Sequence, residues 1–321
     1  MKTVFAGTSE FAVPSLEALI ASAHEVLAVI TQTDKPSGRG GRVHMSPVKE
    51  IALAHSVPVL QPERIADPSA IDEIKALGPI GALVVVAYGQ KIPRELLEWP
   101  RYGCVNVHGS ILPRFRGAAP IQHAIIAGEK VTGVTTMLMD EGWDTGDILL
   151  QESVEILPEE DAGTLSHRLS LLGARLLVRT LDGLEMGTIN PIPQDDELAS
   201  FAPSLRREYG AIDWSAPADV IVNLIRGCTP KPGAYTQRGS TLVKVWRAAI
   251  EQAGGRCGEP GEVNRVDQDG IVVAAGEGSV RLIEVQPESR KRVSAAEFAR
   301  GARLKSGDRF EVRPGMISAR E

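Results

Sequence analysis

The sequence predicts a two-domain α/β protein, in which a doubly wound parallel sheet is followed by a small β-barrel. Three observations support this prediction. The chain has 321 residues, about twice the length of a typical single domain. In its first half, apolar strand-like segments alternate with amphipathic helix-like segments, which is typical of a parallel sheet with helices on both faces. In its last third, short strand-like segments alternate with glycine-rich turns, which is typical of a barrel.

Residues 1–189 are expected to form a Rossmann-like domain. Residues 82–87 are a continuous apolar run, as in a central strand that is covered on both faces. Residues 162–184 form a long amphipathic pattern that ends at Gly187. The other expected strands are 2–7, 25–32, 57–60, 103–108, 133–139 and 148–156, and the last two can pair antiparallel to each other. The other expected helices are 14–22, 47–55, 68–77 and 119–127.

Residues 190–204 are expected to be a linker, because they contain three prolines, two adjacent aspartates and few large apolar side chains. Residues 205–321 are then expected to form an OB-like barrel. Turns such as Asp269-Gly270 separate the strand candidates of this part. These candidates are residues 241–248, 261–266, 270–275 and 279–285, and one helix is expected at 217–226.

Composition limits the classes of protein to which the chain can belong. No stretch of eighteen apolar residues is present, so no membrane span is expected. The three cysteines are far apart and the start lacks a signal-peptide pattern, which indicates a cytoplasmic protein without a disulfide framework. Residues 1–204 carry 16 basic and 26 acidic side chains, whereas residues 205–321 carry 19 and 15. A basic second part fits a polyanionic partner, and it fits an uneven solvated surface equally well.

Asn106 and His108 are the first candidates for chemistry. They lie two residues apart at the end of an expected strand, so both side chains point to the same face. In an open α/β sheet, ligands bind beyond the carboxyl ends of the strands. An amide beside an imidazole suits charge stabilisation and proton transfer. An Asn-x-His pair by itself has a structural role in most proteins, so the spacing alone leaves both interpretations open.

The loops that follow contain further candidates and exclude some ligands. Residues 140–147 form a tight acidic loop, but their spacing does not match a calcium-binding EF-hand loop. No zinc-site spacing is present, so no metal is expected. The early Gly7-Thr8 turn lacks the GxGxxG pattern of a dinucleotide site. Residues 34–42 are a glycine-rich loop with three basic side chains, and composition alone predicts an ordinary surface loop there.

Several sequence stretches stand at fixed spacing along the chain. They are Asn106-Val107-His108-Gly109-Ser110-Ile111-Leu112-Pro113, Arg114-x-Arg116-Gly117, Thr132-Gly133-Val134-Thr135, Asp144-Thr145-Gly146-Asp147 and, outside this segment, Phe5-Ala6-Gly7-Thr8, Gly38-Arg39-Gly40 and Ile212-Asp213-Trp214. Together they closely resemble the signature of the folate-dependent formyltransferases. Within that superfamily the chain is most similar to the methionyl-tRNA formyltransferases, and the resemblance covers nearly its full length. Trp143 departs from the pattern, because that family usually has Leu there.

The resemblance implies roles for particular residues. Asn106, His108 and Asp144 would be the catalytic residues that move a formyl group from 10-formyltetrahydrofolate to the amino group of methionyl initiator tRNA, without a metal. Arg39 and Arg42, in the glycine-rich loop, would contact the acceptor end of the tRNA. The site needs only one chain, so a monomer is expected. The residues expected to bind the folate are Ser110, Ile111, Leu112, Pro113, Val86, Tyr88 and Asp140.

Three other functions share parts of this pattern. A sugar-nucleotide formyltransferase has the same core and would not need the Arg39 loop or a basic barrel. A formyl-folate hydrolase would use the same three residues with water as the acceptor. An RNA-binding protein on an inactive enzyme fold would have no use for the three residues Asn106, His108 and Asp144.

Overall fold

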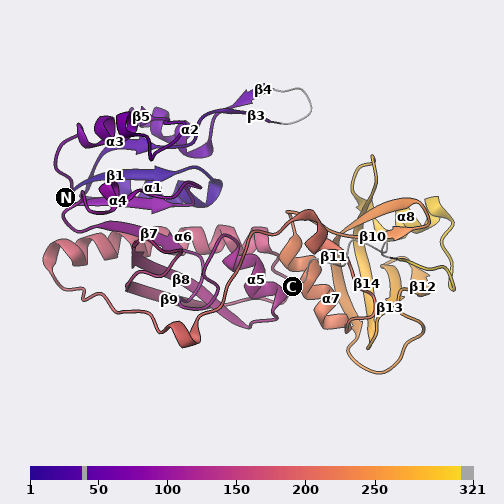
Figure 1. Cartoon of the computed structure of the whole chain (residues 1–321). Helices are drawn as coiled ribbons and strands as arrows, with labels where there is room; N and C mark the ends of the chain where they lie inside the picture. Colours follow the sequence, from indigo (N-terminus) through magenta and orange to yellow (C-terminus); the bar gives the residue numbers. More distant parts are fainter. Residues whose placement is uncertain (38–41, 312–321) are drawn as a thin grey trace. The chain divides into compact units, whose positions relative to one another are not determined.

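The computed structural model describes residues 1–37 and 42–311, which form two compact units (Figure 1). The first unit contains Met1–Gly117, Val131–Val154 and Ser166–Ala202. The second contains Ala118–Lys130, Glu155–Leu165 and the chain from Pro203 onward. Most of the expected linker, up to Ala202, therefore packs with the first unit. The division into residues 1–189, 190–204 and 205–321 stays a prediction.

A seven-stranded sheet is the centre of the first unit, with the strand order β5-β2-β1-β6-β7-β8-β9. The pairs β1–β2, β1–β6, β2–β5 and β6–β7 are parallel, and β8 runs antiparallel to β7. The chain places β2 on one side of β1 and later returns to place β6 on the other. This reversal is the switch point beside which such sheets bind ligands. The strands are β1 Lys2–Gly7, β2 Glu25–Ile30, β5 Val59–Leu60, β6 Ala82–Val86, β7 Cys104–His108, β8 Val131–Leu138 and β9 Ile148–Glu155.

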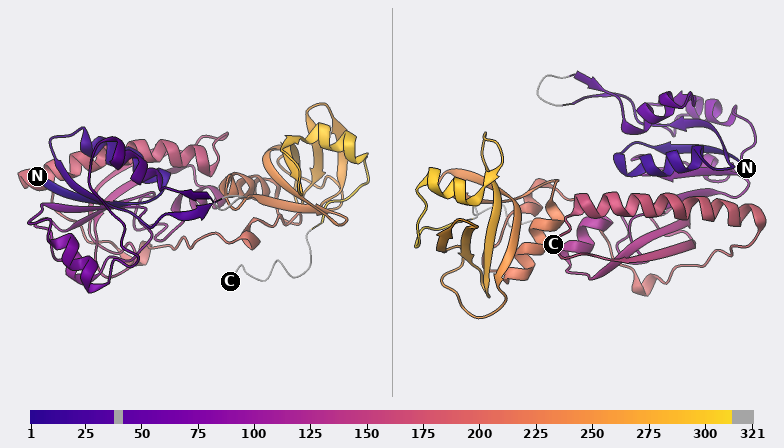
Figure 2. Two further views of the ribbon diagram at one scale, coloured as in Figure 1. Left: turned by 90° about the horizontal axis from the view of Figure 1, so that it is seen from above. Right: turned by 180° about the vertical axis from the view of Figure 1, so that it is seen from behind.

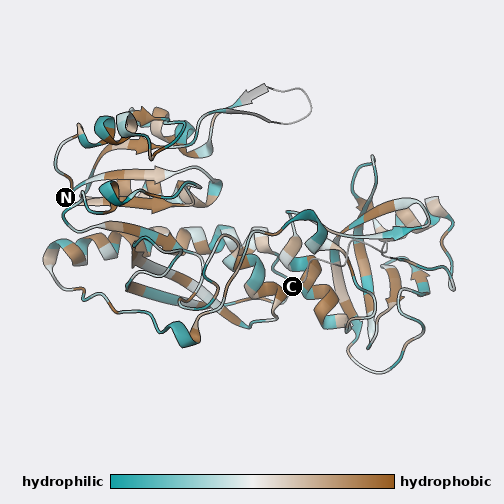
Figure 3. Ribbon diagram, in the orientation of Figure 1, coloured by the Kyte–Doolittle hydropathy of each residue, from teal (hydrophilic) through white to brown (hydrophobic). Residues whose placement is uncertain are grey.

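Helices lie on both faces of this sheet (Figure 2). On one face, Ile71 and Ile74 of α3 and Leu96 of α4 join the core cluster that contains Leu83 and Val85. The central strands are hydrophobic along their length (Figure 3), because both of their faces are covered. The helices are α1 Val13–Ile20, α2 Pro47–Ala54, α3 Pro68–Lys75, α4 Arg94–Leu97 and α6 Ala162–Met186, with short 3-10 turns η1 Glu10–Ala12 and η2 Asp196–Leu198 and a hairpin of β3 Lys35–Ser37 and β4 Arg42–His44.

The second unit contains an antiparallel sheet with the order β10-β11-β14-β13-β12, and β15 pairs with β14. Glu311 pairs with Gln237 of β10, and Arg309 pairs with Glu262 just before β12. Residues 309–311 thus join the two edges of the sheet, as in a barrel. The elements are α5 Pro120–Ile126, η3 Arg207–Gly210, α7 Ala218–Cys228, β10 Ala234–Arg238, β11 Thr241–Gln252, β12 Val263–Asp267, β13 Gly270–Ala274, β14 Ser279–Pro287, β15 Val293–Ser294 and α8 Ala295–Ala302.

The predicted fold class is confirmed, and most element boundaries agree within a few residues. The hairpin β3–β4, the short helix α4, the strands β10 and β15 and the helix α8 were not expected. Among the described residues, no helix combines the length and the apolar composition that crossing a membrane requires.

Four charged side chains link three strands of the second unit. Arg281 donates from Nη1 to Asp267 Oδ1 at 2.6 Å and from Nε to Glu251 Oε2 at 2.8 Å. Arg265 contacts the same two carboxylates. The hydrogen bond from Arg281 holds the pKa of both carboxyls below their ordinary values. A carboxyl whose pKa is lowered on folding stabilises the protein at pH values above its unfolded-state pKa. This stabilisation is lost as the pH falls through the folded-state pKa.

We therefore expect Asp267→Asn to lower the Tm by about 2 °C at pH 7, with a difference from the wild type that shrinks as the pH falls below about 4. Calorimetry from pH 2 to pH 7 measures this, because the contribution is lost only as the pH falls towards the lowered pKa of the folded state. The matched control is Asp269→Asn, because the Asp269 side chain is exposed and has no ionic partner among the described residues. A difference as large at pH 2 as at pH 7 would show that these ion pairs are not its source.

Candidate active site

The expected catalytic residues Asn106 and His108 lie on β7 toward its carboxyl end, which is His108, and Asp144 lies in the loop after β8. Thr8, after β1, donates from Oγ1 to the Tyr88 carbonyl oxygen at 2.9 Å, and Gln32 donates from Nε2 to the same oxygen at 3.0 Å. These bonds tie the ends of β1, β2 and β6 together. β7 continues the row and ends at His108. The carboxyl ends of the central strands thus lie at one edge of the sheet, where such sheets bind their ligands.

His108 lies between two acceptors. Its side chain is 6% exposed. Its Nε2 lies 2.9 Å from the Phe115 carbonyl oxygen, and its Nδ1 lies 3.6 Å from Oδ2 of Asp144. A carbonyl oxygen can only accept, so Nε2 carries a proton. The 3.6 Å between Nδ1 and Asp144 is an ion-pair distance rather than a hydrogen-bond distance, and the two groups attract each other when the ring is protonated.

Asp144 is held in an unusual backbone conformation. Its φ is +56°, in the left-handed region that non-glycine residues rarely adopt and that is concentrated at functional sites. Its Oδ2 accepts a hydrogen bond from the Gly117 backbone N–H at 2.8 Å. Gly117 has φ +118°, and a Cβ there would lie 2.8 Å from the Ala202 carbonyl oxygen. Glycine is therefore required at the position that donates to Asp144.

Asn106 lies on β7 with its Cα paired to Met137 of β8. Two positions along the strand, His108 pairs with Thr135, so Asn106 and His108 share a face. Asn106 is half-buried. Its side-chain amide makes no hydrogen bond to any residue in the described part of the chain, which leaves its NH2 group available to a ligand. The structure thus brings the three expected catalytic residues together.

The expected folate-binding turn, Ser110 to Pro113, is held from below by β8 and β9. Thr135 donates from Oγ1 to the Ser110 carbonyl oxygen at 2.7 Å and accepts from the Leu112 N–H at 3.1 Å. Gln151 donates from Nε2 to the Leu112 carbonyl oxygen at 2.9 Å. The side chains of Ser110 and Leu112 are buried, whereas Ile111 and Pro113 are half-buried. Only the latter two side chains are open to a ligand.

The other three expected folate contacts differ in what they present. Val86 ends β6 and is buried. Tyr88 is buried in the core beside Leu83 and Val85, and this burial raises its pKa to about 12. A ligand at this edge can reach only the backbone of both residues, next to the exposed Ala87 with its φ of +45°. Asp140 is exposed and accepts from the Gly142 N–H and the Thr145 hydroxyl, which shapes the acidic loop.

Of the two expected tRNA-binding residues, the structure describes only the backbone of Arg42. Arg39 lies outside the described residues. Arg42 belongs to β4 by its backbone alone. The chain just before this hairpin is described: Lys49 of α2 donates to Asp34 Oδ2 at 2.6 Å, and Gln61 donates to Asp34 Oδ1 at 2.8 Å. These bonds fix Asp34, the first residue of the glycine-rich loop.

Sequence reasoning assigned no role to four residues that support the site. Thr135 and Gly117 were in the recognised motifs, and the strand pairing of β7 with β8 would have indicated the position of Thr135. Gln151 has no comparable signal. Gln194 lies in the expected linker, and the polar composition of that segment gives no signal that Gln194 contacts the site.

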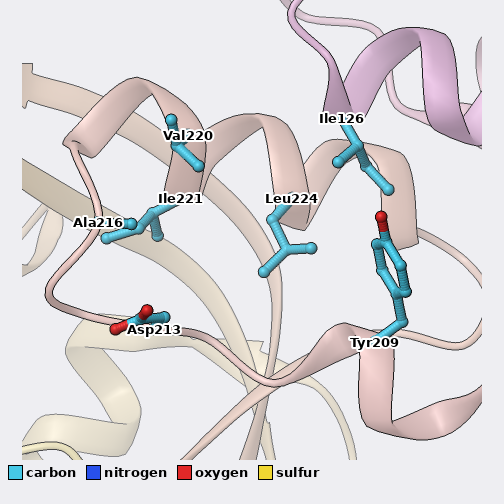
Figure 4. A pocket seen from close by; sticks show the side chains of 7 residues that line it. All are labelled: Ile126, Tyr209, Asp213, Ala216, Val220, Ile221 and Leu224. Atoms are coloured by element: carbon cyan, nitrogen blue, oxygen red, sulfur yellow. The ribbon is translucent and has the colours of Figure 1, made fainter. Parts of the chain in front are cut away.

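An apolar pocket in the second unit contains none of the expected site residues. It is lined by Ile126, Tyr209, Asp213, Ala216, Val220, Ile221 and Leu224 (Figure 4).

Residues 1–181 match the family model described as formyl transferase, and residues 204–303 match the one described as formyl transferase, C-terminal domain. The chain belongs to the formyl transferase family. A methionyl-tRNA formyltransferase of Geobacter metallireducens is 48% identical over 97% of this chain and 98% of its own length. One of Citrifermentans bemidjiense is 49% identical over 96% of this chain and 95% of its own length.

Solved structures of formyl transferases share the fold at low sequence identity. An N-formyltransferase from Helicobacter canadensis, in complex with folinic acid and dTDP-3-aminofucose, superposes with a TM-score of 0.64 at 18% identity. The match covers 88% of this chain and 99% of that one. A methionyl-tRNA formyltransferase from Clostridium thermocellum matches with a TM-score of 0.54 at 18% identity, over 78% of this chain and 94% of that one.

Proposed function

We propose that the chain transfers the formyl group of 10-formyltetrahydrofolate to the α-amino group of methionyl initiator tRNA, for translation initiation. The observation that carries this proposal is the near-full-length identity, close to half of all positions, to relatives named methionyl-tRNA formyltransferase. The cluster of Asn106, His108 and Asp144 supports the chemistry independently. The enzyme is proposed to act as a monomer, because the cluster is complete within one chain. It is proposed to act in the cytoplasm, where translation initiation takes place.

The proposed reaction begins with attack of the amine on the formyl carbon. The carbonyl electron pair moves to oxygen, and a tetrahedral oxyanion forms. The free amide of Asn106 donates a hydrogen bond to this oxygen, and the His108 imidazolium stabilises the same charge. One such hydrogen-bond donor lowers the activation barrier of a reaction of this kind by about 3 kcal/mol. Collapse restores the carbonyl and breaks the bond to the folate nitrogen.

Two protons must move in this sequence. The attacking amine loses one, and the departing folate nitrogen gains one. The His108 imidazolium can give a proton to the departing folate nitrogen, and the neutral ring that remains can then take the proton that the attacking amine loses. Asp144 also accepts from the Gly117 N–H, so its carboxylate stays directed at the ring.

The folate is proposed to lie along the edge formed by Val86, Tyr88, Ser110–Pro113 and Asp140. This edge fits a flat ring with polar edges: the backbone beside the exposed Ala87 provides donors and acceptors, and the half-buried Ile111 and Pro113 provide apolar contacts. Asp140 accepts hydrogen bonds from the Gly142 N–H and the Thr145 hydroxyl, and these bonds hold the acidic loop in its turn conformation beside the proposed folate site. Trp143 in that loop is 69% exposed.

The tRNA acceptor end is proposed to bind at Arg39 and Arg42, because arginines pair with phosphates or stack on unpaired bases. We expect Arg39→Ala to raise the KM for methionyl-tRNA about tenfold and to reduce the salt dependence of binding by about one unit, with little change in kcat. Steady-state kinetics at several salt concentrations measure both. The matched control is Arg64→Ala, which removes an exposed cation that pairs with Asp67. Equal effects of the two variants would contradict a specific role for Arg39.

Parallel assays with two acceptors test the proposed function against its alternatives. 10-Formyltetrahydrofolate is supplied with methionyl initiator tRNA, with an amino-sugar nucleotide, or with neither. Transfer to the tRNA alone is expected. Transfer to the sugar alone would identify a sugar-nucleotide formyltransferase, and release of formate without any acceptor would identify a hydrolase. RNA binding without turnover would indicate an inactive binding protein.

A further inference from the structure

Gln194 is the one half-buried side chain in its part of the expected linker. Its neighbours Pro193, Asp195, Asp196 and Glu197 are exposed. Its Nε2 donates to the Asp144 carbonyl oxygen at 2.8 Å and to the Gly146 carbonyl oxygen at 2.7 Å. Its Oε1 accepts from Nε of Arg116 at 3.0 Å. Both donors and the acceptor of one amide are thus used, and all three partners lie in loops of the site.

These bonds act on both chain segments that place the Asp144 carboxylate. The first is the acidic loop, in which Asp144 has its left-handed φ of +56°; Gln194 binds the carbonyl of Asp144 itself and that of Gly146. The second carries Gly117, whose N–H donates to Asp144. The residue before it, Arg116, is 4% exposed and bonded to Gln194.

Other bonds from the same linker fix the second segment but do not reach the first. Arg116 donates its backbone N–H to the Ser200 carbonyl at 2.8 Å, and Ala202 donates to the Arg116 carbonyl at 2.7 Å. Asp196, 84% exposed, accepts from Arg116 Nη2. Gln194 differs from these residues because it bonds to both segments.

We infer that Gln194 is a positioning residue for formyl transfer: it joins the Asp144 loop to the Arg116–Gly117 segment and so directs the Asp144 carboxylate at His108. This inference rests on the proposed function for its kinetic consequence. The left-handed backbone at Asp144 is strained and persists only where the surrounding structure supports it. Loss of the two bonds to this loop therefore lets Asp144 relax away from the ring, and a displacement of about 1 Å in a catalytic group can lower a rate 100-fold.

The test compares three variants with the wild type in formyl transfer to methionyl initiator tRNA. Gln194→Ala removes all three bonds. Gln194→Glu keeps an acceptor for Arg116 but loses the NH2 group that holds the two carbonyls. Both are expected to lower kcat by about 10- to 100-fold, with the KM of tRNA and folate unchanged. Asp195→Ala is the matched linker control, because within the described ranges its carboxylate accepts only from the nearby Glu197 N–H.

The Asp144→Asn background separates positioning from a general structural role. If Gln194 acts through Asp144, Gln194→Ala should add little to the loss already caused by Asp144→Asn. A full additional loss in that background, or an unchanged kcat in both Gln194 variants, would overturn the inference.

A readout without turnover keeps the inference distinct from the proposed function. ¹⁵N NMR of the His108 ring should show a changed Nδ1 signal in Gln194→Ala, because the Asp144 carboxylate no longer lies 3.6 Å from it, while Nε2 keeps its hydrogen bond to Phe115. If the wild type fails to formylate methionyl-tRNA, the proposed function is wrong, and the NMR signals still decide the role of Gln194. Identical His108 signals in wild type and variant would refute it.

Discussion

Replacing His108 by Ala is expected to lower kcat for formyl transfer by about 10³-fold, while the Kd for tRNA changes by less than about twofold. The ring is 6% exposed and bonded to Phe115 and Asp144, so its loss removes the proton carrier and leaves the Asp144 carboxylate without its partner. The backbone bond from Gly117 to Asp144 remains and preserves the loop. Single-turnover kinetics with saturating folate measure the chemical step, and filter binding measures tRNA affinity.

The control for His108→Ala is His55→Ala. His55 follows α2 in the same unit and is exposed. Its removal should leave both quantities at the wild-type values. A kcat for His108→Ala within about tenfold of the wild type would contradict the mechanism, because a group that stabilises the oxyanion and carries the proton contributes more than that.

Local sequence spacing brought together two of the three residues of the candidate cluster. Asn106 and His108 are two residues apart on a strand, and the period of a strand alone places them on one face. The apolar run of β6 and the alternation of strands and helices likewise predicted the parallel sheet, because burial on both faces has a recognisable composition. Asp144 was assigned by resemblance, since 36 positions separate it from His108 and no local pattern links the two.

The contact between Asp144 and His108 depends on structure that the sequence does not express locally. It requires the register of β7 with β8, the left-handed backbone at Asp144 and the close approach of Gly117 to Ala202. Residues 190–202 illustrate the same limit: prolines and acidic residues predict a linker, but Gln194 and Ser200 bind the site loops. The missed helix α8 did have a local signal, because Ser294 caps it by accepting from the Glu297 N–H, a Ser-x-x-Glu pattern.

Replacing Asp144 by Asn is expected to lower kcat by about 10²- to 10⁴-fold with little change in structure. The new amide oxygen can still accept from the Gly117 N–H, as Oδ2 does at 2.8 Å. The same Oδ2 position lies 3.6 Å from Nδ1 of His108, so an uncharged amide oxygen replaces the carboxylate beside the ring. The His108 imidazolium thereby loses its ionic partner. The fold and the ring position survive, and the charge that stabilises the oxyanion is lost.

This substitution separates charge from geometry, and Asp144→Ala supplies the contrast. Ala removes both the charge and the acceptor for Gly117, so Asp144→Ala should lower the Tm as well as kcat, whereas Asp144→Asn should lower kcat alone. The double variant His108→Ala with Asp144→Asn should be no slower than His108→Ala by more than about threefold, because residues that act as one unit are not additive. If the two losses multiplied in full, Asp144 would act on the substrate directly rather than through His108, and the imidazolium would not be the group that it supports.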